Sequence, residues 1–333
     1  MSGSFLVLYI HQLLSRLCLY STVNIMSLVT SPPGTGYNKQ IHQIRKHIET
    51  QFAQAEINPS PFPHLLIENF FPEEVFASIL NLNPFQIMEG EEWIKRQASK
   101  DPARLNSTPY YHRRQIHLDR HLLDLQSEPY QEFWRAIHDC FLSSDHWFEN
   151  LVIQKYKIYF EIRFGDFLKD SDFLKHFKTE FFLQRHRPGY YIGPHTDVPT
   201  RVFTAIFSFA DQEGFEDYGT QVCVPKNPKQ RCWGNRHYDW DNFDVVKVAP
   251  YKPNNFFLFF KTRQSFHAVK TISSDVPNER YGMQFQFYEP PTGVFEDLST
   301  PDLMKAKHHK SSQSPRVKSP NKIQRLLQKI QRS

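Results

Sequence analysis

The sequence predicts an α+β fold with a mainly β core, a double-stranded β-helix of the jelly-roll or cupin-like kind, backed by N-terminal helices. Three observations predict it. Apart from a short pattern near the C-terminus, helical periodicity is confined to the first half of the chain, and short strands separated by Gly, Pro and Asn dominate over residues 181–290. Aromatic residues are abundant, with 30 Phe and 15 Tyr among 333 residues. Such large side chains favour broad sheets over a slim helical bundle.

The expected helical layer follows a Pro- and Gly-rich linker at residues 31–36. Apolar residues at Ile41, Ile44, Ile48 and Phe52 recur at helical spacing and predict an amphipathic helix over 38–56. Three prolines end that helix. A strand is expected over 64–70, and further helices are expected over 72–80 and 129–142.

Strands make up the second half of the chain. Each expected strand is a short run rich in aromatic or β-branched residues and bounded by turn formers. The runs are 181–186, 201–209, 220–224, 244–248, 255–260, 267–272 and 280–288. The stretch 211–242 is longer than a barrel turn requires, and such segments commonly shape access to a site.

A His-x-Asp pattern occurs three times, beginning at His117, His195 and His237, so context must choose among them. The residues around His117 are charge-rich and typical of a solvated face or loop. Those around His237 have little β character and lie only 30 positions before His267. His195 follows a Pro-Gly turn, precedes the strand expected over 201–209, and has both a later histidine and a later arginine, Arg280.

Residues i and i+2 of a strand point to the same face, so His195 and Asp197 are expected to project into one cavity. His267, from a later strand, would add a second imidazole. Two histidines and one carboxylate on one side of a metal hold non-haem Fe(II) and leave its other coordination positions open. The alternative is that both histidines are hydrogen-bonded structural residues.

Three runs of the sequence resemble the Fe(II)/2-oxoglutarate-dependent oxygenases, the prolyl-4-hydroxylase-like branch in particular. They are Tyr190–Asp197, Ser265–Val269 and Arg280–Phe285. The resemblance implies that His195, Asp197 and His267 are catalytic and hold Fe(II), with 2-oxoglutarate and O2 as cosubstrates. It implies hydroxylation of an unidentified small-molecule or peptidyl substrate, with release of succinate and CO2.

The resemblance also implies a fixed cation for the far carboxylate of 2-oxoglutarate. Arg280 begins a strongly β segment, and its planar guanidinium can pair with a carboxylate through two parallel hydrogen bonds. The alternative is that Arg280 pairs with Asp275 or Glu279 on the surface. In that case Arg263 or Lys270 would have to bind the far carboxylate of 2-oxoglutarate in its place. The candidates for an assisting cosubstrate-binding hydroxyl are Tyr191, Thr204 and Thr271.

Other functions remain open. A non-catalytic barrel could serve as a binding module, and a cupin-like metalloenzyme could use another divalent metal without 2-oxoglutarate. A zinc site built from Cys223, Cys232 and His237 is disfavoured by the spacing of the cysteines and by the missing fourth ligand.

Three regions are expected along the chain. Residues 1–36 form a poorly structured extension, residues 37–292 the oxygenase domain with its β core at about 181–290, and residues 293–333 a basic tail. Met26 is an alternative start, which is favoured over a targeting sequence because no basic residue precedes the apolar run at Phe5. No apolar stretch approaches the ~20 residues of a membrane span. The four scattered cysteines predict a reducing compartment, the cytoplasm.

The net charge of +5 is mild, but nine Lys or Arg and no Asp or Glu lie between Leu303 and Ser333. No nucleic-acid-binding module is recognisable, so no specific nucleic-acid partner is expected. Apolar residues over 323–330 follow a helical pattern on this basic tail. That short helix is expected to pack on its own domain or on a second copy in a homodimer, and binding to an acidic membrane surface or partner is the alternative.

Overall fold

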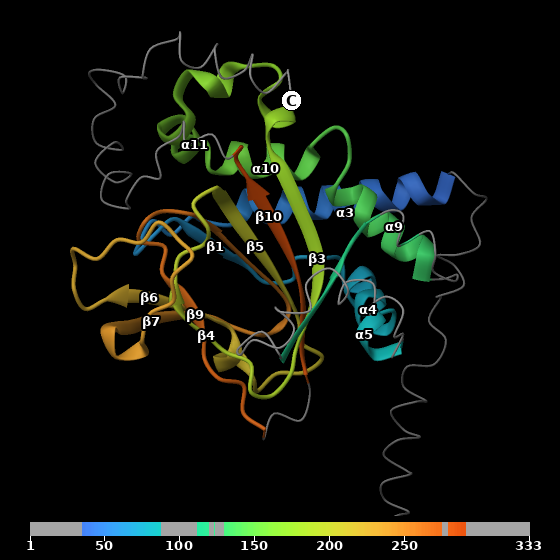
Figure 1. Cartoon of the computed structure of the whole chain (residues 1–333). Coiled ribbons are helices and arrows are strands. Elements are labelled where there is room, and N and C mark those ends of the chain that lie inside the picture. Colours follow the sequence, from blue (N-terminus) through green and yellow to red (C-terminus); the bar gives the residue numbers. More distant parts are fainter. Residues whose placement is uncertain (1–34, 88–111, 120–122, 124–129, 275–278, 291–333) are drawn as a thin grey trace, which may run out of the picture. The chain divides into compact units, whose positions relative to one another are not determined.

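The structure is a computed structural model that describes residues 35–87, 112–119, 123, 130–274 and 279–290 (Figure 1). The chain divides into compact units of residues 1–43 and 44–333. The first unit contributes only the start of helix α3 (Thr35–Gln54) to the described residues. The predictions for the N-terminal extension and for the basic tail therefore fall almost entirely outside the described residues.

The predicted helices are present. α3 (Thr35–Gln54), α4 (Glu73–Asn81) and α9 (Tyr130–Phe141) match the three expected segments within a few residues. The structure adds a short α5 (Pro84–Ile87), and two helices that were not predicted, α10 (Trp147–Lys155) and α11 (Lys157–Phe164). The last two are rich in aromatic and β-branched residues, which have weak helical preference, so tertiary packing decides their conformation.

Two antiparallel sheets form the β core. The six-stranded sheet has the order β1-β8-β5-β10-β3-β2, and the four-stranded sheet has the order β4-β9-β6-β7. The bounds of the larger sheet are β1 (His64–Ile67), β8 (Pro253–Phe260), β5 (Arg201–Phe209), β10 (Arg280–Tyr288), β3 (Lys178–His186) and β2 (Arg113–His117). Those of the smaller sheet are β4 (Ile192–His195), β9 (His267–Val269), β6 (Thr220–Pro225) and β7 (Phe243–Ala249).

Every predicted strand is present, and β5 and β10 have the expected bounds. The prediction for the residues around His117 was wrong, because Arg113–His117 is strand β2 and not a solvated loop. Arg113, Gln115 and His117 line a polar cavity, and from sequence alone such a strand cannot be distinguished from a solvent-exposed segment.

The two faces of the six-stranded sheet differ in chemistry. In the middle of β3 and β10 the odd-numbered side chains are apolar and buried: Phe181, Leu183, Met283, Phe285 and Phe287. The even-numbered side chains of the same strands line a cavity and are mostly polar: Glu180, Phe182, Gln184, His186, Arg280, Gln284, Gln286 and Tyr288. Because side chains alternate along a strand, one sheet forms both the core and the floor of a site.

Helices cover the apolar face (Figure 1). Phe52 of α3 lies 5.7 Å from Phe256 of β8, and Phe148 of α10 lies 4.8 Å from Phe285 of β10, measured between ring centroids. Phe256 also stacks on Phe70 at 4.2 Å. These aromatic residues are therefore packed between the helices and the sheet.

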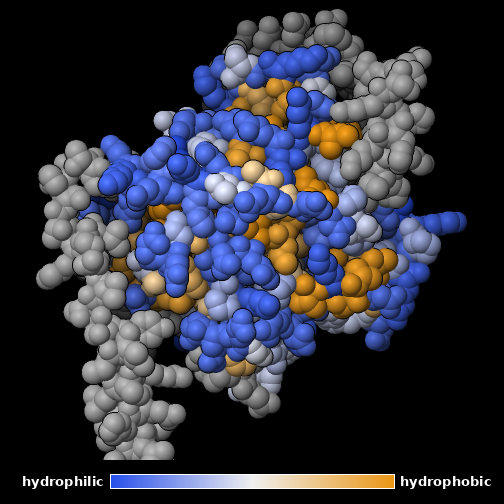
Figure 2. Space-filling view, turned by 180° about the vertical axis from the view of Figure 1, so that it is seen from behind, coloured by the Kyte–Doolittle hydropathy of each residue, from blue (hydrophilic) through white to orange (hydrophobic). Residues whose placement is uncertain are grey.

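The opposite face of β8 packs against the smaller sheet. Phe257 and Phe259 form an apolar cluster with Val222 of β6 and Ala249 of β7, so the two sheets face each other there. Hydrophilic residues cover most of the surface seen from behind, with hydrophobic residues in separate patches (Figure 2). Among the described residues, no helix is long and apolar enough to cross a membrane.

Candidate metal centre

A cavity of about 620 Å³ lies between the polar face of the larger sheet and the smaller sheet. Its volume is in the range typical of sites for small ligands. β2, β3, β5 and β10 supply its floor, and β4, β9 and the segment after β6 supply His195, His267, Asn235 and His237.

His195, Asp197 and His267 converge at this cavity. Each offers one ligand atom, and these atoms lie within 4.8 Å of one another. His267 Nε2 is 3.8 Å from Asp197 Oδ1, and the two imidazole centroids are 4.3 Å apart. Within the described ranges, no other group of three His, Cys, Asp or Glu side chains meets this condition.

Strand pairing explains the convergence. His195 is the last residue of β4 and His267 is the first residue of β9, and the two residues are opposite each other in the antiparallel ladder. Asp197 differs from the sequence-based expectation, because it lies beyond the end of β4 and not within the strand. The chain after the strand end still directs its carboxylate toward the imidazoles.

Both imidazoles are oriented by the same local hydrogen bond. His195 Nδ1 lies 3.0 Å from the carbonyl oxygen of Gly193, and His267 Nδ1 lies 3.0 Å from that of Ser265. Because a carbonyl only accepts, each Nδ1 carries the proton and each Nε2 keeps its lone pair. Burial and the neighbouring His267 lower the pKa of His195 to about 3, so this ring is neutral at physiological pH and suited to bind a metal.

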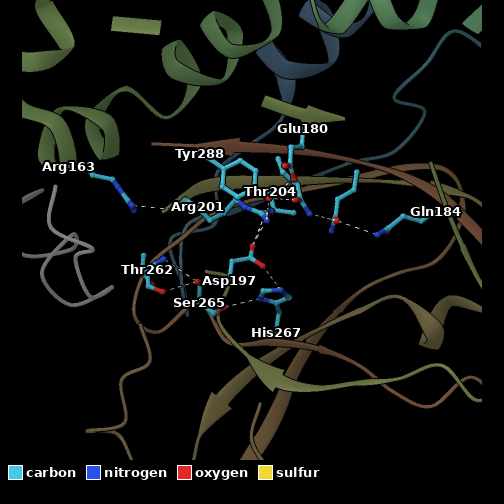
Figure 3. A network of polar contacts seen from close by, with 12 residues as sticks. Arg163, Glu180, Gln184, Asp197, Arg201, Thr204, Thr262, Ser265, His267 and Tyr288 are labelled. Atoms are coloured by element: carbon cyan, nitrogen blue, oxygen red, sulfur yellow. Dashed lines mark hydrogen bonds and ion pairs between the residues drawn. The ribbon is translucent and has the colours of Figure 1, made fainter. Parts of the chain in front are cut away.

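Asp197 is held from the other side by the larger sheet (Figure 3). Thr204 Oγ1 donates a hydrogen bond to Asp197 Oδ2 at 2.6 Å, and Arg201 Nη1 lies 3.9 Å from the same oxygen. Burial alone would raise the pKa of Asp197. The Arg201 guanidinium, the two imidazoles and the Thr204 hydrogen bond outweigh burial and hold that pKa below its usual range. The carboxylate is therefore charged.

Arg280 lies in the same cavity and is only 7% exposed. Its Nη1 has no hydrogen-bond partner among the described residues. Glu279, the described carboxylate with which surface pairing was considered, pairs with Arg185 and Arg187. Asp275 lies outside the described residues. A buried guanidinium with a free donor requires an acceptor, and a carboxylate-bearing ligand is well suited to supply it.

His186 lies beside Arg280 and was not predicted from sequence. It is 5% exposed and stacks on Tyr190 at 4.1 Å, and neither of its ring nitrogens has a partner in the part of the chain that the structure describes. Burial, then Arg280 and Arg113, lower the pKa of His186 well below its usual value, so the ring is neutral. The unsatisfied donors at this end of the cavity thus come from two neighbouring strands, β3 and β10.

The hydroxyl candidates have different positions. Tyr191 is 40% exposed and does not line the cavity, whereas Tyr190, one residue earlier, does. The sequence could not give the phase of alternation after the Pro-Gly turn. Thr204 donates its hydrogen bond to the Asp197 carboxylate and does not line the cavity. Thr271 is exposed.

The other candidate residues lie in unrelated surroundings. Arg263 lies over the Trp233 ring, and Lys270 pairs with Asp217. Cys223 and Cys232 pack in an apolar cluster with Phe243 and Phe266, which does not suit a zinc site.

His237 is a further residue whose position the sequence did not reveal. It forms an isolated β-bridge with His195, and its ring stacks on the His195 ring at 4.8 Å. It is exposed and lines the cavity. The segment predicted to shape access to the site therefore contributes a side chain next to a candidate metal ligand.

No protein-family model matches the sequence, and no curated protein matches it. Among solved structures, the chain is similar to a prolyl-4-hydroxylase from Pseudomonas putida, with 10% identity, a TM-score of 0.37, and coverage of 74% of this chain and 99% of that chain. It is also similar to HygX from Streptomyces hygroscopicus with nickel, 2-oxoglutarate and hygromycin B bound, with 10% identity, a TM-score of 0.35, and coverage of 69% and 83%. A third is the non-haem α-ketoglutarate-dependent epimerase SnoN from nogalamycin biosynthesis, with 10% identity, a TM-score of 0.33, and coverage of 83% and 94%. All three TM-scores lie below 0.5, so the assignment of the site rests on its own geometry.

Proposed function

We propose that the chain is an Fe(II)- and 2-oxoglutarate-dependent dioxygenase that hydroxylates a small-molecule or peptidyl substrate. The observation that carries the proposal is the convergence of His195, Asp197 and His267, with both Nε2 lone pairs free, in the cavity that also contains Arg280. Two imidazoles and one carboxylate are the donor set of non-haem Fe(II) sites with open positions.

The path of the chain through the two sheets supports a double-stranded β-helix. From β3 to β6 the strands alternate between the larger and the smaller sheet, β7 stays in the smaller sheet, and β8, β9 and β10 alternate again. Such a chain wraps around the space between the sheets, and the metal ligands come from the ends of β4 and β9 on one side of it.

His195, Asp197 and His267 would hold the metal, and Arg280 would bind the far carboxylate of 2-oxoglutarate. When bound, Fe(II) and 2-oxoglutarate supply the oxidation of the substrate by O2, with decarboxylation of the cosubstrate to succinate and CO2. Gly193 and Ser265 orient the imidazoles through their carbonyl oxygens. His186, Tyr190 and Tyr251 lie around Arg280.

The test is the visible charge-transfer band that Fe(II) and 2-oxoglutarate give together under anaerobic conditions, followed by succinate formation after O2 is added. We expect both with the wild-type protein. Asp197→Ala should abolish both, while Asp217→Ala, at an exposed carboxylate paired with Lys270, should leave both unchanged. Absence of the band and of retained iron in the wild type would refute the proposal.

The same experiment separates the other functions. A non-catalytic binding module would form no succinate above background. A metalloenzyme with different chemistry would bind a divalent metal but would be indifferent to 2-oxoglutarate.

A further inference from the structure

A continuous series of hydrogen bonds leads away from the outer oxygen of Asp197 (Figure 3). Thr204 donates to Asp197 Oδ2 at 2.6 Å, and Arg201 Nη1 donates to Thr204 Oγ1 at 2.8 Å. The hydroxyl of Thr204 is thus both an acceptor and a donor, and the guanidinium fixes the direction in which it donates. Asp197 Oδ1 is left facing His267 Nε2 at 3.8 Å.

The series continues across the larger sheet. Arg201 Nη2 donates to the Tyr288 hydroxyl at 2.7 Å, and the single proton of that hydroxyl faces two acceptors, Gln286 Oε1 at 2.5 Å and Glu180 Oε2 at 2.8 Å. The Arg201 guanidinium also lies 4.2 Å from the centroid of the Tyr288 ring. We refer to Thr204, Arg201, Tyr288 and Glu180 as the relay.

The members of the relay lie on strands of the larger sheet, whereas Asp197, the ligand that they hold, does not lie on a strand. Thr204 and Arg201 are on β5, Tyr288 is on β10 and Glu180 is on β3, three adjacent strands of one sheet. Arg201 and Tyr288 are opposite each other in the ladder. Asp197 lies beyond the end of β4 and has no ladder partner.

A carboxylate that is free to rotate can bind a metal through one oxygen or through both. The second mode would occupy a further coordination position. A strong hydrogen bond to one oxygen favours binding through the other, and such partners of metal-binding side chains strongly affect metal affinity. A hydrogen bond that fixes one carboxylate oxygen matters most for a ligand, such as Asp197, that is not held by strand pairing.

We propose that Thr204 and Arg201 are positioning residues that fix Asp197 as a ligand through Oδ1 alone, with Tyr288 and Glu180 holding Arg201 in place. The inference rests on the metal site of the proposed function but not on the identity of the cosubstrate or the substrate. The relay thus keeps open one coordination position on the metal that Asp197 would occupy if it bound through both oxygens.

The experiment is a titration of the metal-free full chain with Co(II) alone, followed by the visible spectrum of the bound ion. Thr204→Val removes the hydroxyl and keeps the shape of the side chain. We expect about 10- to 100-fold weaker Co(II) binding and a changed spectrum, because the carboxylate can then turn. Thr204→Ser keeps the hydroxyl and should restore both.

Thr179→Val is the matched control. Thr179 Oγ1 also donates to a carboxylate oxygen, that of Glu149, at 3.0 Å, but Glu149 is not near the metal ligands. Its Co(II) affinity and spectrum should equal those of the wild type, even if its stability falls. A Thr204→Val protein with wild-type affinity and spectrum would overturn the inference, and so would failure of Thr204→Ser to restore them.

A second pair of variants tests the far end of the relay. Tyr288→Phe removes the hydroxyl that accepts from Arg201 and should weaken Co(II) binding by about 3- to 10-fold, a smaller loss because the effect passes through Arg201. Tyr281→Phe, on the same strand with its hydroxyl bonded to Glu279, is the control. Equal Co(II) affinity in these two variants would remove Tyr288 from the relay. A wild-type protein that binds no Co(II) would instead refute the metal site itself, and the two failures are therefore distinct.

Discussion

Arg280 combines three properties that seldom occur together: it is buried, charged, and has a donor without a partner among the described residues. Leaving such a group unsatisfied is unfavourable unless a ligand completes it. The neighbouring side chains of His186 and Tyr190 do not supply a carboxylate. We therefore expect Arg280 to contribute more to ligand binding than to folding.

Arg280→Met should weaken binding of 2-oxoglutarate to the Co(II)-loaded protein by about 10- to 150-fold, because a hydrogen bond to a charged group contributes about 1.5–3 kcal/mol. Co(II) affinity should not change. Calorimetric titration with 2-oxoglutarate measures the effect. Arg187→Met, at the surface partner of Glu279, is the control, and equal losses in the two variants would contradict the assignment.

His186 makes the metal-free protein sensitive to acid. Because the pKa of His186 is well below 6.5 in the folded chain, the unfolded chain binds the extra proton first as the pH falls. Stability is therefore complete above about pH 6.5 and is lost below it. Between pH 7.5 and 5.5, the loss from this one ring is about 1.4 kcal/mol.

His186→Gln should reduce the loss of stability between these two pH values by about that amount. Urea unfolding of the metal-free protein at both pH values measures it. His42→Gln, at an exposed position of α3, is the control. An identical pH dependence in wild type and His186→Gln would show that the ring is not held neutral.

Among single residues, the sequence could predict those whose chemical type a metal or a carboxylate restricts. His195, Asp197, His267 and Arg280 lie at one cavity as expected, because strand context chose correctly among three similar motifs. Tyr191 was one position off, since the phase of alternation depends on how the preceding turn closes. The contacts of His186, Arg201 and His237 include residues far away in the sequence, and no local pattern marks them.

At the scale of single elements, the segment after β6 packs against the backbone of the candidate metal ligand Asp197. Gly234, in the segment after β6, has φ +120°, and a Cβ there would lie 2.3 Å from the carbonyl oxygen of Asp197. This segment therefore supports the backbone of a ligand that no ladder holds. Only glycine allows so close an approach.

Gly234→Ala should weaken Co(II) binding by about tenfold or more, because the backbone of Asp197 must shift. Gly214→Ala is the control: its φ is +100°, but a Cβ there would meet nothing within 4 Å. Both variants should lose about 1–3 kcal/mol of unfolding free energy from backbone strain. If their Co(II) affinities are equal, the contact with Asp197 does not position the ligand.

Among the elements, β5 and β10 could be predicted with their bounds because aromatic and β-branched residues fill them. β2 could not, since its charges suggest solvent, and α11 could not, since its sequence alternates like a strand. In each case the deciding factor is the surface that the element meets, and that surface comes from residues far away in the chain.

For the molecule as a whole, stability and binding are divided between the two faces of one sheet. Phe256 is fully buried on the apolar face, with ring contacts to Phe52, Phe70, Phe148 and Phe207. The candidate metal ligands lie on the opposite side. Damage to the core should therefore affect stability and leave the chemistry of the site unchanged.

Phe256→Ala should lower the free energy of unfolding by about 3–5 kcal/mol, as for other large aromatic residues removed from cores. The folded fraction should still bind Co(II) with wild-type affinity. Urea unfolding and Co(II) titration measure the two quantities, and Val245→Ala, at an exposed position of β7, is the control. A loss below about 1 kcal/mol would show that the helices do not depend on this ring.

The alternation of side chains along β3 and β10 has a practical consequence for redesign. Randomising only Gln184 and Gln284 would vary the lining of the cavity without touching the relay or a single aromatic contact beneath the helices. A one-residue deletion in either strand would do the reverse, because it would turn phenylalanines toward the ligand and glutamines toward the interior.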